Sequence, residues 1–217
     1  LTMKNANASI NKGGAIGFDN ALFLRLKNVN FIGNKNTYVG GAHIGGGALY
    51  SDLSAIIEDC VFENNTAGNY GGAIYNTNYM DMKNCLLKNN SAAKSGGAIY
   101  AGSGQRITNC TFFNNISTTE NYAVSGGANL IIKNAILWGS GSQFKSDTTG
   151  TIEYSDVQGG FGSLVSRECM SFDPVFINSA SGDLHLSASS DCVDAGTSEG
   201  APAFDIEGQV RPQGQGY

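Results

Sequence analysis

The chain of 217 residues has a formal net charge of −5 and contains 30 glycines, 3 prolines and 14% charged residues. The acidic balance argues against nucleic acid or anionic lipid as a partner, because both require a basic protein surface. No stretch approaches the roughly 20 apolar residues that a membrane-spanning helix needs, so we predict no membrane insertion. A glycine-rich, weakly charged composition is typical of short strands joined by tight corners.

A repeat of 25 residues organises most of the chain. It is clearest at Cys60, Cys85 and Cys110, each of which follows an Asn or Asp and is followed four and five residues later by a pair of asparagines. Less regular copies extend it in both directions: we place Asn5–Ala6 and Asp156–Val157 at the positions of Asn84–Cys85. A fixed period of this length predicts a stacked repeat fold of about seven copies.

Within a copy, apolar residues alternate with period two and the phase breaks at the asparagine, as at Met80, Met82, Asn84, Cys85 and Leu87. Period two predicts a strand, and the phase break predicts a corner. We expect three strands per copy, so that equivalent strands of successive triangular coils stack about 4.8 Å apart in three parallel sheets. The sequence therefore predicts an all-β fold, a right-handed parallel β-helix, or solenoid, over residues 1–160.

Stacking also explains which residues recur in each column. The inward column that contains Cys60, Cys85 and Cys110 is small and apolar. No histidine accompanies it and a linear stack cannot surround an ion, so we interpret it as core and predict no metal site there. In the corner column before it, an amide can bond to its counterpart one coil away. The predicted corner ladder includes Asn28, Asp59, Asn84, Asn109 and Asn134, and a second ladder runs through Asn11, Asn34, Asn65, Asn90 and Asn115.

After residue 160 the period is lost, and residues 161–217 have the pattern of irregular turns and short strands. Because an open β-helix end exposes unpaired strand edges, we expect this segment to cap the last coil within one continuous domain. A disulfide between Cys169 and Cys192 would staple the cap in an oxidising compartment, and two free thiols are the alternative.

Acidic residues of the same segment could hold Ca²⁺, although Asp beside Gly or Pro is first a turn signal. No other cofactor is expected. These acidic residues are Asp173, Asp183, Asp191, Asp194, Asp205 and Glu207.

Two sets of short motifs resemble known families. The runs Gly-Gly-Ala-Ile and Phe-x-x-Asn resemble the repeats of polymorphic outer-membrane proteins and of the adhesin-like proteins of methanogenic archaea. They occur at Gly71–Ile74, Gly96–Ile99, Phe31–Asn34, Phe62–Asn65 and Phe112–Asn115. The later runs are similar to the end of surface-anchored β-helix proteins of the choice-of-anchor type. They are Ser155–Gly160, Asp173–Phe176, Asp194–Gly196 and Asp205–Gly208, with Arg211–Pro212. The resemblance implies a β-helix in a secreted or cell-surface, extracellular prokaryotic protein.

Tyr50, Tyr75 and Tyr100 each follow an aliphatic residue in equivalent positions of three copies. If the aliphatic residues point inward, strand alternation directs the tyrosines outward as a flat aromatic ladder. Such a ladder can be an interaction surface that stacks on sugar rings or packs against a neighbouring subunit. The alternative is that the ladder only stabilises the sheet.

The sequence offers no convergent catalytic constellation. A polysaccharide lyase or glycoside hydrolase needs acidic residues and a base on one face, whereas the acids of the repeats are scattered and His43 and His185 are isolated. We therefore predict no catalytic residues and an extracellular structural or adhesive protein that self-assembles head to tail into a filament, sheath or layer. Glycans or a host cell surface are further expected partners. The alternative is a carbohydrate-active enzyme or a glycan-binding module on the same fold.

Overall fold

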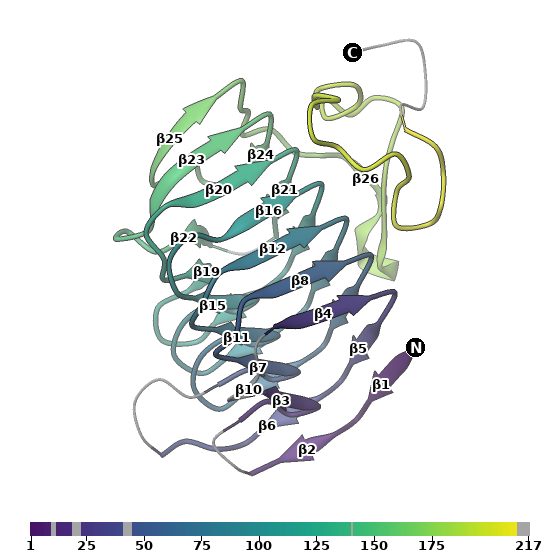
Figure 1. The fold of residues 1–217 in the computed structure, drawn as a ribbon. Helices are drawn as coiled ribbons and strands as arrows, with labels where there is room; N and C mark the ends of the chain where they lie inside the picture. Colours follow the sequence, from purple (N-terminus) through teal and green to yellow (C-terminus); the bar gives the residue numbers. More distant parts are fainter. Residues whose placement is uncertain (10–11, 19–22, 41–44, 140, 212–217) are drawn as a thin grey trace.

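Each regular coil contributes four short strands, which pair with the equivalent strands of the coils on either side. The computed structural model describes residues 1–9, 12–18, 23–40, 45–139 and 141–211. The strands of neighbouring coils pair in parallel and in register, as Leu87 pairs with Phe62 and with Phe112. The predicted right-handed parallel β-helix is confirmed (Figure 1).

The coils build four parallel sheets, which we call A to D in the order in which the chain first enters them. Sheet A comprises β1 (Thr2–Lys4), β5 (Asn30–Ile32), β9 (Val61–Glu63), β13 (Leu86–Lys88), β17 (Thr111–Phe113), β21 (Ile136–Trp138) and β24 (Asp156–Val157). Sheet B comprises β2 (Asn7–Ala8), β6 (Lys35–Asn36), β10 (Thr66–Ala67), β14 (Ser91–Ala92) and β18 (Ile116–Ser117).

Sheet C comprises β3 (Ile16–Phe18), β7 (Leu49–Ser51), β11 (Ile74–Asn76), β15 (Ile99–Ala101), β19 (Tyr122–Ser125) and β22 (Ser142–Phe144). Sheet D comprises β4 (Leu24–Lys27), β8 (Ala55–Glu58), β12 (Met80–Lys83), β16 (Arg106–Thr108), β20 (Leu130–Lys133), β23 (Thr149–Glu153) and β25 (Ser163–Arg167). The prediction of three sheets was wrong, because the segment that we expected to be a loop holds the two-residue strands of sheet B.

Left-handed backbone conformations make the corners on both sides of sheet A. The corner between sheets D and A has positive φ at Asn28, Asp59, Asn84, Asn109, Asn134, Tyr154 and Glu168. The corner between sheets A and B has positive φ at Asn5, Gly33, Asn64, Asn89, Asn114, Gly139 and Gly159. Asparagine and glycine tolerate this conformation best, which explains why they recur at both corners.

The predicted register was wrong in the first and last coils. Met3 pairs with Phe31, so Asn5 lies at the corner between sheets A and B and not at the position of Asn84. Val157 pairs with Leu137, which places it in the column of large core residues and not in the cysteine column. Asparagine fits either corner, so Asn5 alone does not distinguish the two registers.

The core is a set of continuous columns along the solenoid axis. One column stacks Met3, Phe31, Phe62, Leu87, Phe112, Leu137 and Val157. The rings of Phe31 and Phe62 are 4.8 Å apart at their centroids and within 6° of parallel. The narrower column next to it contains the buried thiols Cys60, Cys85 and Cys110, and Cys169 joins it at the far end. In-register stacking thus repeats the same packing from coil to coil.

A ladder of buried amides closes the corner between sheets A and B. Asn65 Oδ1 accepts hydrogen bonds from the main-chain N and from Nδ2 of Asn34, at 2.9 and 3.0 Å. Asn65 Nδ2 in turn donates to Asn90 Oδ1 and to the carbonyl of Phe31. Asn90 repeats this arrangement with Asn115. Asn11, which we had expected in this ladder, lies outside the described residues.

The solenoid continues past residue 160, where we expected it to end. Strand β25 pairs with β23 over five residues, and Asp156 forms a parallel bridge with Met170. Residues 171–211, which we call the tail, then turn back beside sheet A (Figure 1). They contain β26 (Phe176–Asn178), the 3₁₀ helix η1 (Ser179–Ser181) and β27 (Asp183–Leu186), with β26 and β27 antiparallel. The predicted cap therefore covers a side of the solenoid.

Within the described residues, no helix is long and apolar enough to cross a membrane.

Candidate functional site

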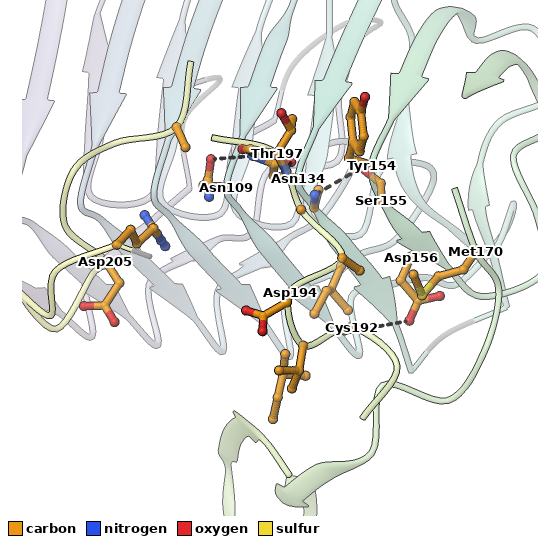
Figure 2. Close-up of a pocket in the computed structure, with 18 of the residues that line it drawn as sticks. Asn109, Asn134, Tyr154, Ser155, Asp156, Met170, Cys192, Asp194, Thr197 and Asp205 are labelled. Carbon is orange, nitrogen blue, oxygen red and sulfur yellow. Dashed lines mark hydrogen bonds between the residues drawn. The ribbon is translucent and has the colours of Figure 1, made fainter. Parts of the chain in front are cut away.

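A groove lies between the outer face of sheet A and the tail. It consists of two adjoining cavities of about 500 and 530 Å³. Both are lined by Asn109, His185, Asp205 and Arg211, so they form one continuous depression. Figure 2 shows the end nearest the last coils, where Cys192 and Thr197 of the tail lie beside Asp156 and Asn134 of the solenoid.

The corner asparagines of the solenoid hold the tail in place. Asn84 Oδ1 accepts a hydrogen bond from Arg211 Nη1 at 2.9 Å, and Asn84 Nδ2 donates to the carbonyl of Phe204 at 3.3 Å. Two coils further on, Asn134 exchanges hydrogen bonds with the main chain of Thr197, at 2.7 and 2.9 Å. The predicted corner ladder thus serves as an attachment line for a segment distant in the sequence.

Contacts within the ladder itself are fewer than those to the tail. Asn84 Nδ2 donates to Asp59 Oδ1 at 2.7 Å, and Asn134 Nδ2 donates to Asn109 Oδ1 at 3.3 Å. Asn84 and Asn134 therefore bond both along the solenoid axis and outward to the tail. This second role explains why the column keeps polar side chains although its backbone conformation would also accept glycine.

An ion pair and an aromatic contact complete the docking of the tail. Lys133 Nζ lies 2.8 Å from Glu199 Oε2, and this lysine lowers the pKa of the Glu199 carboxyl. The ring of Phe176 packs perpendicular to that of Phe113, with centroids 5.6 Å apart. The exposed ion pair contributes little on its own, so the asparagine contacts and Phe176 carry most of the docking.

His185 lies between two carboxylates, contrary to our expectation that it is isolated. Its Nδ1 is 2.6 Å from Asp183 Oδ1, and its Nε2 is 3.2 Å from Glu207 Oε2. Asp183 and Glu207 raise the pKa of His185, and His185 lowers the pKa of Asp183. With both ring nitrogens engaged, the side chain of His185 joins β27 to the turn at Glu207. His43, the other histidine considered, lies outside the described residues.

Asp156 and Cys192 meet at the other end of the groove. Cys192 Sγ donates to Asp156 Oδ2 at 3.2 Å (Figure 2). Burial, together with the neighbouring carboxylate, raises the pKa of the Cys192 thiol to about 12. Burial also raises the pKa of Asp156. The thiol is therefore a hydrogen-bond donor and not a nucleophile at neutral pH.

The disulfide considered for the tail is not formed in the structure, where all five cysteines are free. Cys169 Sγ points into the solenoid and donates to the carbonyls of Ile152 and Arg167. Cys192 belongs to the tail and donates to Asp156. The two thiols differ in their partners because Cys169 belongs to the last coil and not to a cap.

The tyrosine ladder is flat, as expected, but its central member is not exposed. Tyr75 lies 5.5 Å from Tyr50 and 5.1 Å from Tyr100 between ring centroids, with interplanar angles of 8° and 7°. Only 1% of Tyr75 is exposed, and burial raises its pKa well above the usual value. The expectation that Tyr75 faces solvent was wrong, because its two neighbours cover both faces of its ring.

The cysteine column and three acidic residues of the tail have local structural roles. Cys85 lies in the core, where burial raises the pKa of its thiol. In the tail, Asp173, Asp183 and Asp205 each accept a main-chain N–H two residues later, which is the hydrogen bond of an Asx turn. In the part of the chain that the structure describes, no three His, Cys, Asp or Glu residues are arranged to hold a metal ion.

One of these contacts follows from strand alternation. Asp183 and His185 are two residues apart in a strand, so alternation places them on one face. Nothing local, however, pairs His185 with Glu207 or Arg211 with Asn84, which is 127 residues away.

Two of the regular coils are similar to a known repeat family. Residues 59–77 and 84–102 match the family of the Chlamydia polymorphic membrane protein repeat. These segments run from sheet A through sheet C in two successive coils, and they do not include the tail. No curated protein and no solved structure matched the chain in the corresponding searches.

Proposed function

We propose that this protein is an extracellular, cell-surface β-helix with a structural or adhesive role and without catalysis. The match of two coils to the Chlamydia polymorphic membrane protein repeat is the observation that carries the proposal. The matched residues form core columns and corners, which explains why a repeat pattern persists in a protein whose role is to present a long rigid surface.

Surface location is tested on intact cells that produce the protein. An antibody against the tail should label them without permeabilisation, and added protease should remove the labelling. Purified protein should also adhere to cells or glycans when immobilised. Labelling that appears only after permeabilisation would contradict the proposal.

The finer proposal is that copies associate with one another. Both the first coils and the tail carry exposed large apolar side chains, and exposed apolar area of this kind is enriched at interfaces. Light scattering across a range of concentrations should show mass increasing beyond that of one chain, and electron microscopy should show filaments or layers. A monomer at all concentrations contradicts self-association and leaves the surface role untouched.

The groove favours one second candidate, a glycan-binding module or carbohydrate-active enzyme. Its lining combines corner amides, the Asp205 carboxylate and Arg211 in a depression of the size that small ligands occupy. Calorimetric titration with neutral and acidic oligosaccharides tests binding, and analysis of released products tests catalysis. Tyr50 and Tyr100 are partly exposed and form a second candidate binding surface. Their substitution should be tested in the same binding and product assays.

A further inference from the structure

Charge is distributed very unevenly along the chain. Residues 171–217 contain seven acidic residues and one basic residue, a formal charge of −6, although the whole chain carries only −5. Residues 1–40 contain five basic residues and one acidic residue, a formal charge of +4. The basic residues are Lys4, Lys12, Arg25, Lys27 and Lys35, and they belong to the first coils of the solenoid. Arg25 and Lys27 pair with Glu58 and Asp59 of the next coil, so the exposed Lys4 and Lys35 carry most of the positive charge that a second copy can meet there.

Exposed apolar side chains are concentrated in the same two regions. Of the large hydrophobic residues that are exposed in the described chain, seven belong to the tail and four to residues 1–40. The tail surface consists of Phe172, Val175, Ile177, Val193, Phe204, Ile206 and Val210. The N-terminal surface consists of Leu1, Phe18, Phe23 and Val39, with the basic residues named above. Exposed apolar area gathered within charged surroundings marks an interaction site.

The tail residues face away from the solenoid for a structural reason. Phe176 of β26 packs on Phe113 of sheet A, so strand alternation directs Ile177 to the outer side. Val175, which precedes the strand with a left-handed backbone conformation, is exposed as well. Phe204 and Val210 form an antiparallel bridge, which places them side by side. The apolar residues of the tail that are not used to dock on sheet A therefore remain uncovered in a single chain.

Coaxial stacking of coils is a poorer way for two copies to associate. If β4 of one copy paired in register with β25 of another, Lys27 would lie opposite Arg167, since both belong to the column that contains Lys83 and Lys133. The core column of Leu26 and Ile57 also ends at Ser166, which is exposed and polar. Like charges directly opposite each other across strands destabilise the pairing.

We propose that the tail surface of one copy docks on the N-terminal surface of a second copy of this chain. The two surfaces are opposite in charge, and both present apolar residues that the single chain leaves exposed. The contact is heterologous, because each copy uses a different surface, so it builds open chains unless its rotation closes a ring. This inference rests on the self-association in the proposed function, and it names the surfaces.

The first test compares two pairs of substitutions in the full chain by sedimentation equilibrium. Ile177→Ser with Val210→Ser removes exposed apolar area from the tail surface, and we expect association to weaken by roughly tenfold or more. Ile131→Ser with Val165→Ser is the matched control, since both residues are exposed on sheet D outside the two surfaces. Equal weakening by both pairs would overturn the inference.

The second test uses charge. Lys4→Glu with Lys35→Glu should weaken association, and adding Asp191→Lys to the same molecules should restore part of it. Association of the unmodified chain should be weaker in 0.5 M salt than in 0.05 M salt. Arg167→Gln should have no effect. Stronger association of Arg167→Gln, or stronger association in salt, would assign the contact to coaxial stacking instead. A chain that never associates contradicts the self-association proposal itself. Association that the tail substitutions leave unchanged contradicts only the assignment of these two surfaces.

Discussion

The solenoid and the tail use polar side chains in opposite surroundings. In the solenoid, Asn65 is fully buried, and its amide bonds to the coils on both sides. In the tail, His185 makes its contacts with Asp183 and Glu207 while 60% of its side chain remains exposed. The coils therefore derive stability from repetition, whereas the tail depends on a few contacts made once. Substitutions should therefore unfold the first and only loosen the second.

The largest expected effect is that of Asn65→Leu. The substitution leaves the N and Nδ2 of Asn34 and the carbonyl of Phe31 without their partner in a buried site. At about 1–3 kcal/mol for each of these three unsatisfied groups, we expect a loss on the order of 3–9 kcal/mol in the free energy of unfolding. Urea denaturation measures it. Asn7→Leu, on the exposed face of β2, is the control and should change stability by less than about 0.5 kcal/mol.

A core substitution in the solenoid comes next. Phe112→Ala removes a fully buried ring from the column between Leu87 and Leu137 and should cost about 3–5 kcal/mol. The same change at Phe204, an exposed residue of the tail, should leave urea unfolding of the solenoid within about 0.5 kcal/mol of the unmodified chain. Similar losses at the two positions would show that the tail and the coils unfold as one unit.

Arg211→Ala should loosen the tail without unfolding the coils. Its guanidinium donates to Asn84 Oδ1 and to the carbonyl of Phe204, and loss of these contacts should cost roughly 1–2 kcal/mol of local stability. Limited proteolysis should cut the tail faster, and hydrogen exchange should rise between residues 171 and 211 but not in sheet D. Arg106→Ala, an exposed arginine of β16, is the control. Unchanged tail protection would refute the assigned anchoring role.

The smallest effect is the pH dependence of the tail. The pKa of His185 is raised from its usual 6.5, so the stability that it contributes is fully present below that pH and is lost as pH rises through the raised value. The pKa of Asp183 is lowered from 3.8, so its contribution is present above that pH and is lost as pH falls through the lowered value. Proteolysis of the tail should therefore accelerate toward alkaline pH, and His185→Asn should remove the dependence. Acceleration that persists in this variant contradicts the assignment.

The period of the sequence was enough to predict the β-helix and most of its columns, because the same physical requirement recurs in every coil. It failed where recurrence is weak. Asn5 fits either corner, and only the pairing of Met3 with Phe31 assigns it to the second. The contacts that hold the tail could not be predicted from the sequence, because no local pattern relates Arg211 to Asn84. Burial of Tyr75 was missed because alternation gives the direction of a side chain but not what covers it.

The two corners on either side of sheet A have a practical consequence. They are always five residues apart, as at Asn28 and Gly33 or at Asn84 and Asn89. Equivalent residues of successive coils, by contrast, are between 14 and 31 positions apart. Differences in coil length therefore arise outside sheet A and its two corners, away from the face that carries the tail. A foreign peptide placed after Val39, in the longest of these coils, should be displayed without altering the register of sheet A or the attachment of the tail.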